Sequence, residues 1–136
     1  MTDTNQNIDL YRGDTGIIHV DLTNDDGSAF DTSPPTLNIT WLMAKTSHAL
    51  ESDALIAKTL GGGITALAGG GIDIALSAID TDLKPNLYYH QLRVINGAEV
   101  ATAMVGVMRI RNTLRKTTLG AVPTAQIMLT ASVPGH

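Results

Sequence analysis

Histidine, serine and acidic side chains are the groups in this chain that could carry acid–base or nucleophilic chemistry. The histidines are scattered, without the short paired spacing of metal ligands: His19, His48, His90 and His136. A Ser–His–Asp triad needs its serine in a strained strand-to-helix turn, and no serine here has that setting. Asp80 and Asp82 lie in one short turn, which indicates corner residues and not a pair of glycosidase carboxylates. The sequence therefore predicts that the protein is not an enzyme and has no catalytic residues.

Two glycine triplets, beginning at Gly61 and Gly69, are the segments that could bind a nucleotide. Neither triplet is followed by the Lys-Ser/Thr pair of a phosphate-binding loop. The dinucleotide pattern also fails, because the sixth residue counted from Gly61 is Ala66. The absence of cysteine excludes thiolate catalysis, cysteine zinc sites and disulfides. We interpret the triplets as turn glycines and expect no cofactor.

One polar turn gathers oxygen atoms of the kind that calcium prefers. Its residues are Asp21, Asn24, Asp25, Asp26, Ser28 and Asp31. Their spacing does not match the helix-loop-helix calcium loop, which also ends in a bidentate glutamate. The sequence favours a solvated hairpin turn and no metal site, with weak ion binding at Asp25-Asp26 as the alternative.

The acidic and basic residues are unevenly divided along the chain. Residues 1–108 hold all 13 acids and five bases, a net charge of −8, and residues 109–136 hold four bases and no acid. These four bases are Arg109, Arg111, Arg115 and Lys116. They indicate either a solvated strand end with a polar tail or an arm that docks on an acidic partner, including a neighbouring copy. No aromatic residue lies among them, so we expect no nucleic-acid binding.

Alternation of apolar and polar residues predicts strands along most of the chain. Hydrophobic residues make up 43% and aromatic residues 4%, so the core must be mainly aliphatic. Ile39, Trp41 and Met43 share one face of the segment 36–45, and we expect Trp41 to anchor the core from a central strand. Residues 47–60 fit a short helix or a strand, and we prefer a strand over 54–60.

The segment 74–94 predicts a strand, an acidic one-turn corner and a second strand that begins on a tyrosine. In an immunoglobulin-like sandwich, such a corner crosses between the sheets and a tyrosine hydroxyl ties the crossing down. The predicted structural corner residues are Asp82 and Tyr88.

Seven or eight short strands at intervals of about ten residues predict an all-β fold. We expect an antiparallel immunoglobulin-like β-sandwich over residues 1–111, with a jelly roll or small barrel as the alternative. Residues 112–136 contain glycine and proline around one apolar segment and predict an extended C-terminal arm, able to add a strand to a neighbour's sheet. The apolar segment consists of Ile127, Met128 and Leu129.

The run Leu10-Tyr11-Arg12-Gly13-Asp14-Thr15 resembles the opening of small tailed-bacteriophage virion proteins. The later residues Leu76, Asp80-Thr81, Leu83-Lys84-Pro85-Asn86-Leu87-Tyr88, Leu92, Val94, Gly97, Val100-Ala101-Thr102 and Gly106-Val107 are similar to the same proteins. The resemblance is to the N-terminal domain of phage baseplate upper proteins and covers about residues 8–110. One departure is Asn86, where that family usually has glycine, although asparagine also tolerates positive φ.

The resemblance implies a non-enzymatic virion structural protein, made in the host cytoplasm and located in the virion. It would serve as a tail or baseplate component or an anchoring module, and its partners would be other virion structural proteins and further copies in a homo-oligomer. We expect no membrane contact, because no apolar run approaches the ~18 residues that span a bilayer.

Two alternative functions remain open at the level of sequence. One is a capsid decoration or head-fibre protein. The other is a carbohydrate- or receptor-binding β-sandwich, for which five aromatic residues in the whole chain are few. Our hypothesis for the inter-subunit or scaffold contact combines the four C-terminal basic residues with the apolar segment Ile127–Leu129.

Overall fold

Nine β-strands make up the regular structure of the described chain. The computed structural model describes residues 6–46, 53–111 and 125–133. Its strands are β1 (Ile8–Tyr11), β2 (Gly16–Thr23), β3 (Leu37–Ala44), β4 (Ile56–Leu60), β5 (Gly63–Ala66), β6 (Gly71–Leu76), β7 (Asn86–Asn96), β8 (Glu99–Arg111) and β9 (Ala125–Ser132). These ranges contain one short 3-10 turn, η2 (Ala68–Gly70), and none of their residues lies in a helix able to cross a membrane. The predicted all-β class is confirmed, as is a strand within residues 54–60.

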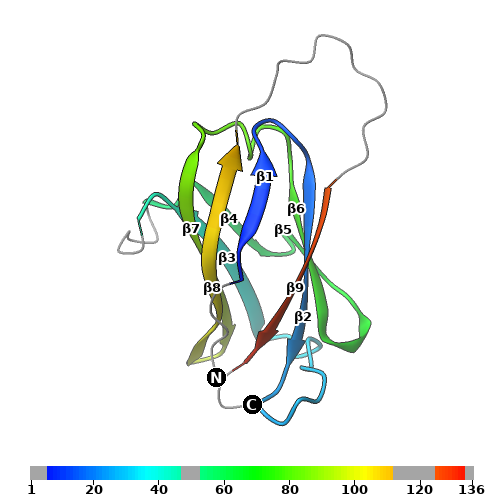
Figure 1. The fold of residues 1–136 in the computed structure, drawn as a ribbon. Helices are drawn as coiled ribbons and strands as arrows, with labels where there is room; N and C mark the ends of the chain where they lie inside the picture. Colours follow the sequence, from blue (N-terminus) through cyan, green and yellow to red (C-terminus); the bar gives the residue numbers. More distant parts are fainter. Residues whose placement is uncertain (1–5, 47–52, 112–124, 134–136) are drawn as a thin grey trace.

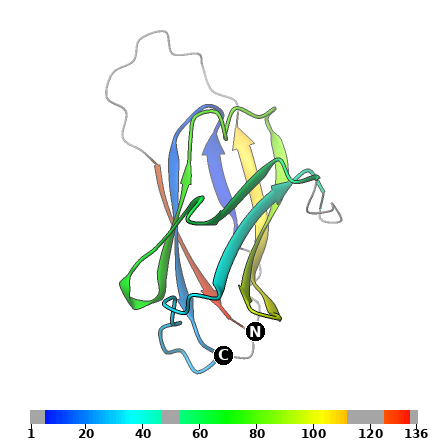
Figure 2. The same ribbon diagram turned by 180° about the vertical axis from the view of Figure 1, so that it is seen from behind.

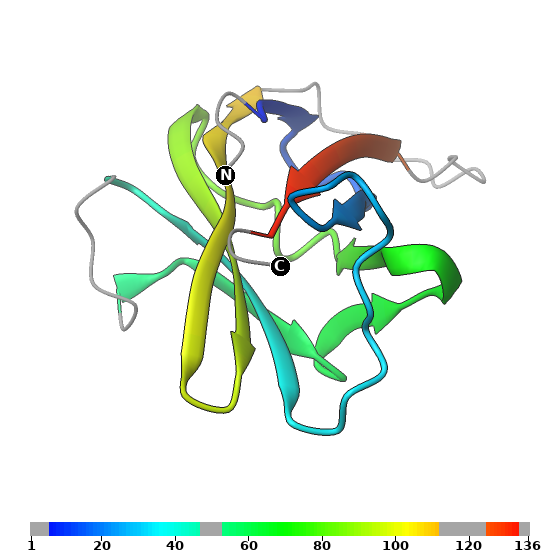
Figure 3. The ribbon, with the colours of Figure 1, turned by 90° about the horizontal axis from the view of Figure 1, so that it is seen from below.

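The strands form one mixed sheet in the order β1-β8-β7-β3-β4-β5-β6-β2-β9. This sheet curls until it is nearly closed into a barrel, as the view along the strands shows (Figure 3). In Figure 1, β7 and β8 lie on one side of the barrel and β2 and β6 on the other. Figure 2 shows the wall behind them, where β3, β4, β5 and β6 follow one another.

The expectation of a wholly antiparallel sheet is wrong for three of its pairings. β1 is parallel to β8, β2 to β9, and β4 to β5. Strands far apart in sequence can meet in either direction, as β1 does with β8 and β2 does with β9. Between β4 and β5 the chain loops through Gly61 and Gly63, whose φ angles of 87° and 105° are in the left-handed region that favours glycine. The alternative of a small barrel therefore describes the curled sheet better than a two-sheet sandwich does.

The core fills the inside of the barrel with aliphatic side chains around one tryptophan. Trp41 is fully buried on β3, which pairs with β7 on one side and β4 on the other. The prediction that Trp41 anchors the core from a central strand is thus confirmed. Inward positions alternate along each strand, so β2 contributes Ile18, Val20 and Leu22 to the same core.

The barrel has one seam, between the edge strands β1 and β9. Gln6, which precedes β1, spans this seam. The backbone N–H of Gln6 donates to the Val105 oxygen at 3.4 Å, and its side-chain oxygen accepts from the Thr130 N–H at 3.4 Å. The neighbouring Asn7 accepts from the Val107 N–H at 3.2 Å. These bonds link β8 to β9, so the N-terminal segment completes the wall that the two edge strands leave open.

The predicted C-terminal arm contains the last strand of the sheet. β9 pairs with β2 of the same chain over its whole length, from Gly16 opposite Ala125 to Thr23 opposite Ser132. Three residues of this segment, Leu129, Ala131 and Val133, are buried in the core. Residues 125–133 therefore belong to the body of the domain, while residues 112–124 and 134–136 lie outside the described ranges.

Candidate interaction surface

Of the two predicted corner residues, Asp82 lies in the turn between β6 and β7, and Tyr88 is the third residue of β7. The hydroxyl of Tyr88 donates to the Lys84 carbonyl at 2.5 Å, and its ring is buried. The carboxylate of Asp82 accepts from Arg12 at 2.8 Å, which joins the corner to the turn after β1. Thr81, also fully buried, donates to the Asp14 carbonyl at 2.6 Å. These bonds attach the turn between β6 and β7 to β7 itself and to the turn after β1.

Asp80, one of the two carboxylates considered for chemistry, also acts within the corner. Its oxygen lies 2.8 Å from the Lys58 ammonium on β4 and accepts from the Ser77 N–H at 2.8 Å. Burial opposes ionisation of this carboxyl, but the hydrogen bonds from Lys58 and Ser77 lower its pKa. The charge of Asp80 is thus used to attach the corner to β4.

The basic residues predicted at the interface lie in different settings. Arg111 makes two hydrogen bonds to Asp9 on β1, at 2.7 and 3.0 Å, and the bond from Arg111 is the main reason that the pKa of Asp9 is lowered. Arg109 is exposed on the outer side of β8. Arg115 and Lys116 lie outside the described residues. The structure therefore brings Arg111 to β1 of its own chain and leaves Arg109 facing outward.

The apolar segment predicted at the interface is divided between the two sides of β9. Leu129 is buried in the core and Ile127 packs against it partly buried. Met128 faces the opposite way and is 66% exposed. Alternation along the strand explains this division, because neighbouring side chains of a strand point to opposite faces. Of these three residues, Met128 alone is placed to meet a partner.

An apolar surface that the sequence interpretation missed covers the outside of β3, β7 and β8. We call the outward side chains of these strands the basic face, because the charged residues among them are arginines. On β7, Leu87 is 45% exposed and Tyr89 41% exposed. Partly buried apolar residues flank Tyr89 in register: Ala44 on β3 and Val107 on β8. The signal was present in the sequence, since apolar residues occupy both sets of alternate positions at the start of β7.

The charged residues of this face all have one sign. Arg93 and Arg109 are its charged outward side chains on β7 and in the stretch of β8 beside it. In register order, the other outward residues of the three strands are Asn38, Thr40, Leu42, Ala44, Leu87, Tyr89, Gln91, Ile95, Val100, Thr102, Val105 and Val107. Arg111 follows at the end of β8, where it pairs with Asp9 of β1. An exposed apolar sheet face of this kind is typical of an interaction surface.

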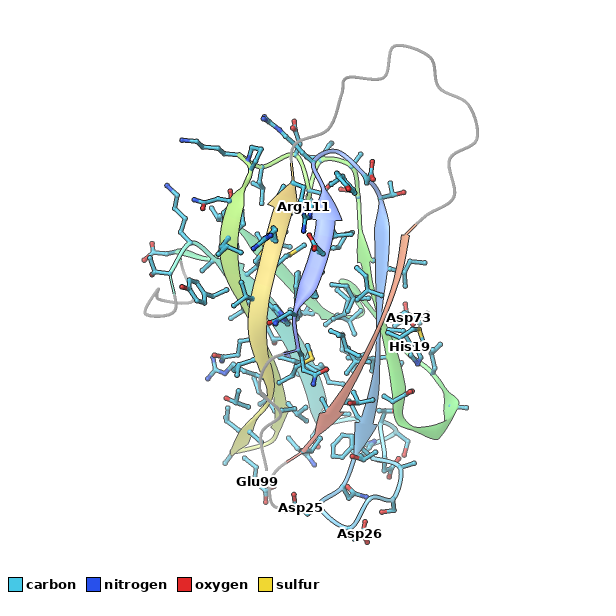
Figure 4. All side chains as sticks on the ribbon, in the orientation of Figure 1. His19, Asp25, Asp26, Asp73, Glu99 and Arg111 are labelled. Atoms are coloured by element: carbon cyan, nitrogen blue, oxygen red, sulfur yellow. The ribbon has the colours of Figure 1, made fainter. Side chains whose placement is uncertain are left out.

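A second outward surface, the acidic face, lies over β2, β6 and β9. Its centre is His19 on β2, which has Met128 of β9 on one side and Asp73 of β6 on the other. The ring nitrogens of His19 lie 2.7 Å from Asp73 and 2.8 Å from Asp21, and Figure 4 shows His19 beside Asp73 on the outside of the barrel. Hydrogen bonding to Asp73 is the largest cause that raises the pKa of His19, and Asp21 adds to it. His19, which the sequence placed on the outer face, thus lies between two carboxylates that favour its protonated form.

His90 has the opposite environment, in the barrel interior. Trp41 donates its indole N–H to Nδ1 of His90 at 3.3 Å, so Nε2 carries the proton and donates to the Gln6 carbonyl at 2.5 Å. Burial lowers the pKa of His90 to about 4, so the ring is neutral at pH 7. Gly106 leaves room for this contact, because a Cβ at that position would collide with the Gln6 carbonyl and with His90 Nε2. The group is a structural connection between β3, β7 and the N-terminal segment.

The oxygen-rich turn after β2 uses its side chains to hold the backbone. Asp26 accepts from the N–H and hydroxyl of Ser28, and these bonds lower its pKa. Asp31 makes the same pair of bonds with Ser33, and Asp21 belongs to the His19 cluster. Figure 4 places Asp25 and Asp26 at one end of the barrel. Within the described ranges, no three or more histidine or acidic residues gather in a way that could hold a metal ion.

The comparisons with known proteins add no assignment to this geometry. No protein-family model matches the chain, and no curated protein matches it either.

Proposed function

We propose that this chain is a structural, non-enzymatic component of a tailed-bacteriophage particle. In this proposal it is made in the host cytoplasm, and it acts in the virion through contacts with further copies of itself and with other virion structural proteins. Its position is in the tail or baseplate, as a component or anchoring module. A capsid decoration or head-fibre protein is the alternative position, and both positions use the same kind of surface contact.

The observation that carries this proposal is the use made of the charged and titratable side chains. Asp9–Arg111, Asp82–Arg12 and Asp80–Lys58 each join segments that are distant in sequence. Both nitrogens of His19 and both nitrogens of His90 have protein partners. Side chains that make such bonds stabilise the fold, which favours a structural protein over an enzyme. The resemblance of residues 8–110 to phage baseplate upper proteins adds the particle as the place of assembly.

The immunoglobulin-like relationship of the fold belongs to the same proposal. The bond from Tyr88 to Lys84 supports it, since a tyrosine corner is a recurrent feature of such folds. The order β8-β7-β3, with long antiparallel pairings, also suits one sheet of such a sandwich. In this proposal β4 and β5 connect the two sheets of the sandwich into one curled sheet.

Carbohydrate or receptor binding is the second alternative, and exposed aromatic rings would be its requirement. Tyr11 is 51% exposed and Tyr89 41% exposed, whereas Phe30 is 6% exposed. Tyr11 lies on β1 and Tyr89 on β7, with β8 between these two strands. Two separated rings on one side of the barrel favour a protein partner over a sugar platform.

The test is the composition of the particle itself. Particles of the phage that encodes this chain are purified by density gradient, and their proteins are counted by quantitative mass spectrometry against the major capsid and tail proteins. We expect the chain in the particles at a fixed copy number that matches a ring or lattice symmetry, and cryo-electron microscopy then places its barrel. A chain that appears in the host lysate but not in the purified particles refutes the proposal.

A further inference from the structure

We infer that copies of this chain associate head to tail, with the basic face of one copy packed against the acidic face of the next. The inference rests on the proposed function for its setting, and it names the two surfaces through which the copies meet. The occupant of each face is therefore a second copy of the same chain.

The basic face supplies an apolar centre with positive charge at its borders. Tyr89 lies in the centre, and Leu87 extends the apolar surface toward Arg109, its neighbour in register on β8. Arg93 lies four residues further along β7 on the same side. The outward residues of β3, β7 and β8 include no carboxylate in the described chain. The surface is thus suited to an apolar partner that carries acidic groups.

The acidic face has the complementary composition. Met128 is its most exposed apolar side chain, and a flexible thioether adapts well to a partner surface. Asp21 and Asp73 lie near it, bonded to the His19 ring between them. Two carboxylates outweigh one imidazolium, so this cluster stays negative whether or not His19 is protonated. Among the described side chains, the outward positions of β2, β6 and β9 include no lysine or arginine.

The positions of the two faces explain why the contact is head to tail. β7 and β8 lie on one side of the barrel and β2 and β6 on the other, as both Figure 1 and Figure 3 show. A copy that uses one face therefore leaves its other face open for a third copy. Such a heterologous contact produces a ring where the rotation closes, and rings are the form in which particle proteins repeat.

Charge also disfavours the simplest competing arrangement, a twofold dimer through the basic face alone. That arrangement brings the arginines of two copies close to one another. Like charges that meet at an interface oppose association. Pairing of the acidic face with itself fails for the same reason, because it brings four carboxylates together.

The experiment uses one variant for each face and measures mass by sedimentation velocity over a wide range of protein concentration. Tyr89→Glu places a carboxylate in the centre of the basic face, and Met128→Arg places a cation in the acidic face. Both side chains are substantially exposed, so both variants should fold, and far-ultraviolet circular dichroism checks this. Ile79, 85% exposed in the corner outside both faces, supplies the matched controls Ile79→Glu and Ile79→Arg.

We expect the unaltered full chain and both controls to show a mass that rises with concentration. Each face variant alone should raise the apparent Kd for association by at least about tenfold, because a like charge then meets its partner face. A mixture of the two variants is the decisive measurement. Each retains one intact face and the two altered faces carry opposite charges, so association that each variant lacks alone should return in the mixture.

Three results would overturn the inference. The first is association of Met128→Arg by itself as strongly as the unaltered chain, which indicates a twofold dimer through the basic face. The second is association of both variants like the controls, which places the contact elsewhere. The third is a full chain that stays monomeric at every concentration. The particle composition is measured independently, so a chain present in particles but unaffected by these substitutions refutes the inference and leaves the proposed function standing.

Discussion

Acidification should destabilise this protein through His90. Its pKa is about 4 in the folded chain and about 6.5 when unfolded, because burial disfavours the charged ring. The unfolded state therefore binds the proton first, so the stabilising contribution of His90 is complete above pH 6.5 and is lost as the pH falls toward 4. A shift of about 2.5 pH units at about 1.4 kcal/mol each sets a limit near 3.5 kcal/mol, of which about 2.5 kcal/mol is lost by pH 4.5.

The assay is urea unfolding at pH 7 and pH 4.5, followed by the fluorescence of Trp41, the single tryptophan of the chain. Trp41 contacts His90 directly, so its emission also reports the change in that contact. His19 acts in the opposite direction. Its raised pKa means that its contribution is complete below pH 6.5 and is lost as the pH rises through the folded value. The measurement is therefore made in a His19→Gln background.

The matched variant is His90→Gln, which can still accept from Trp41 and donate toward Gln6 but does not titrate. It should start from a lower free energy of unfolding at pH 7 and lose much less of it at pH 4.5. The carboxyl groups with lowered pKa values release their own contributions below about pH 4, outside this window. An equal loss of stability in His90→Gln and in its parent would contradict the assignment of the pH dependence to this ring.

Three further substitutions test the packing, each by urea unfolding against the unaltered chain. Gly106→Ala should lower the free energy of unfolding by about 2–3 kcal/mol, since the new Cβ displaces Gln6 and the bonds that close the seam. In a chain that begins after Gln6 the loss should be smaller, because only the collision with the His90 ring remains. Gly70→Ala should lower the free energy of unfolding more than Gly69→Ala does. Both glycines have positive φ, which costs alanine about 1 kcal/mol of backbone strain. A Cβ at residue 70 would also lie 2.7–3.0 Å from backbone atoms, whereas a Cβ at residue 69 has no neighbour within 4 Å. Equal effects at the two positions would contradict the packing at η2. Tyr88→Phe should cost about 1–2 kcal/mol through loss of the corner bond, and no measurable change would show that this bond does not fix the corner.

Local sequence signals were sufficient for the parts of the fold that short segments determine. The pair Asn96-Gly97 is typical of a hairpin turn; it joins β7 to β8, and Gly97 has the positive φ of 62° that such a turn requires. Alternation predicted the inward set that contains Trp41. The order of strand, acidic corner and tyrosine was enough to expect the Tyr88 bond, because its partner Lys84 is only four residues away. Each of these features depends on neighbours within one turn or one strand.

Pairings between the ends of the chain could not be predicted in the same way. Alternation shows that Ile127–Leu129 has two sides but does not identify the strand beside it. The proline and glycine residues before that segment favoured an arm, whereas the structure pairs β9 with β2, more than 100 residues earlier. Deletion of residues 112–136 therefore removes the buried Leu129 and is a test of folding as well as of assembly. The face-specific variants separate the two.

The outward side of β7 was missed because a sequence pattern does not say which of two apolar sets faces the core. Tyr88 and Tyr89 are adjacent, and either could have been the inward residue. The corner decides between them, because Tyr88 must point inward to reach Lys84, which turns Tyr89 to the outside. Tyr89 therefore points outward into the basic face because the neighbouring Tyr88 points inward to bond Lys84.

The uneven charge of the sequence also has a different meaning once the strands are paired. The C-terminal excess of positive charge suggested an arm that meets the acidic body of another copy. Arg111 instead meets an acid of the same chain, since parallel pairing brings β8 beside β1 and Arg111 beside Asp9. Both side chains are about half exposed, so the pair contributes little to stability and serves mainly to fix the register of β1. We therefore expect association of the Arg111→Gln variant to remain sensitive to salt, because Arg109 supplies the outward positive charge of β8.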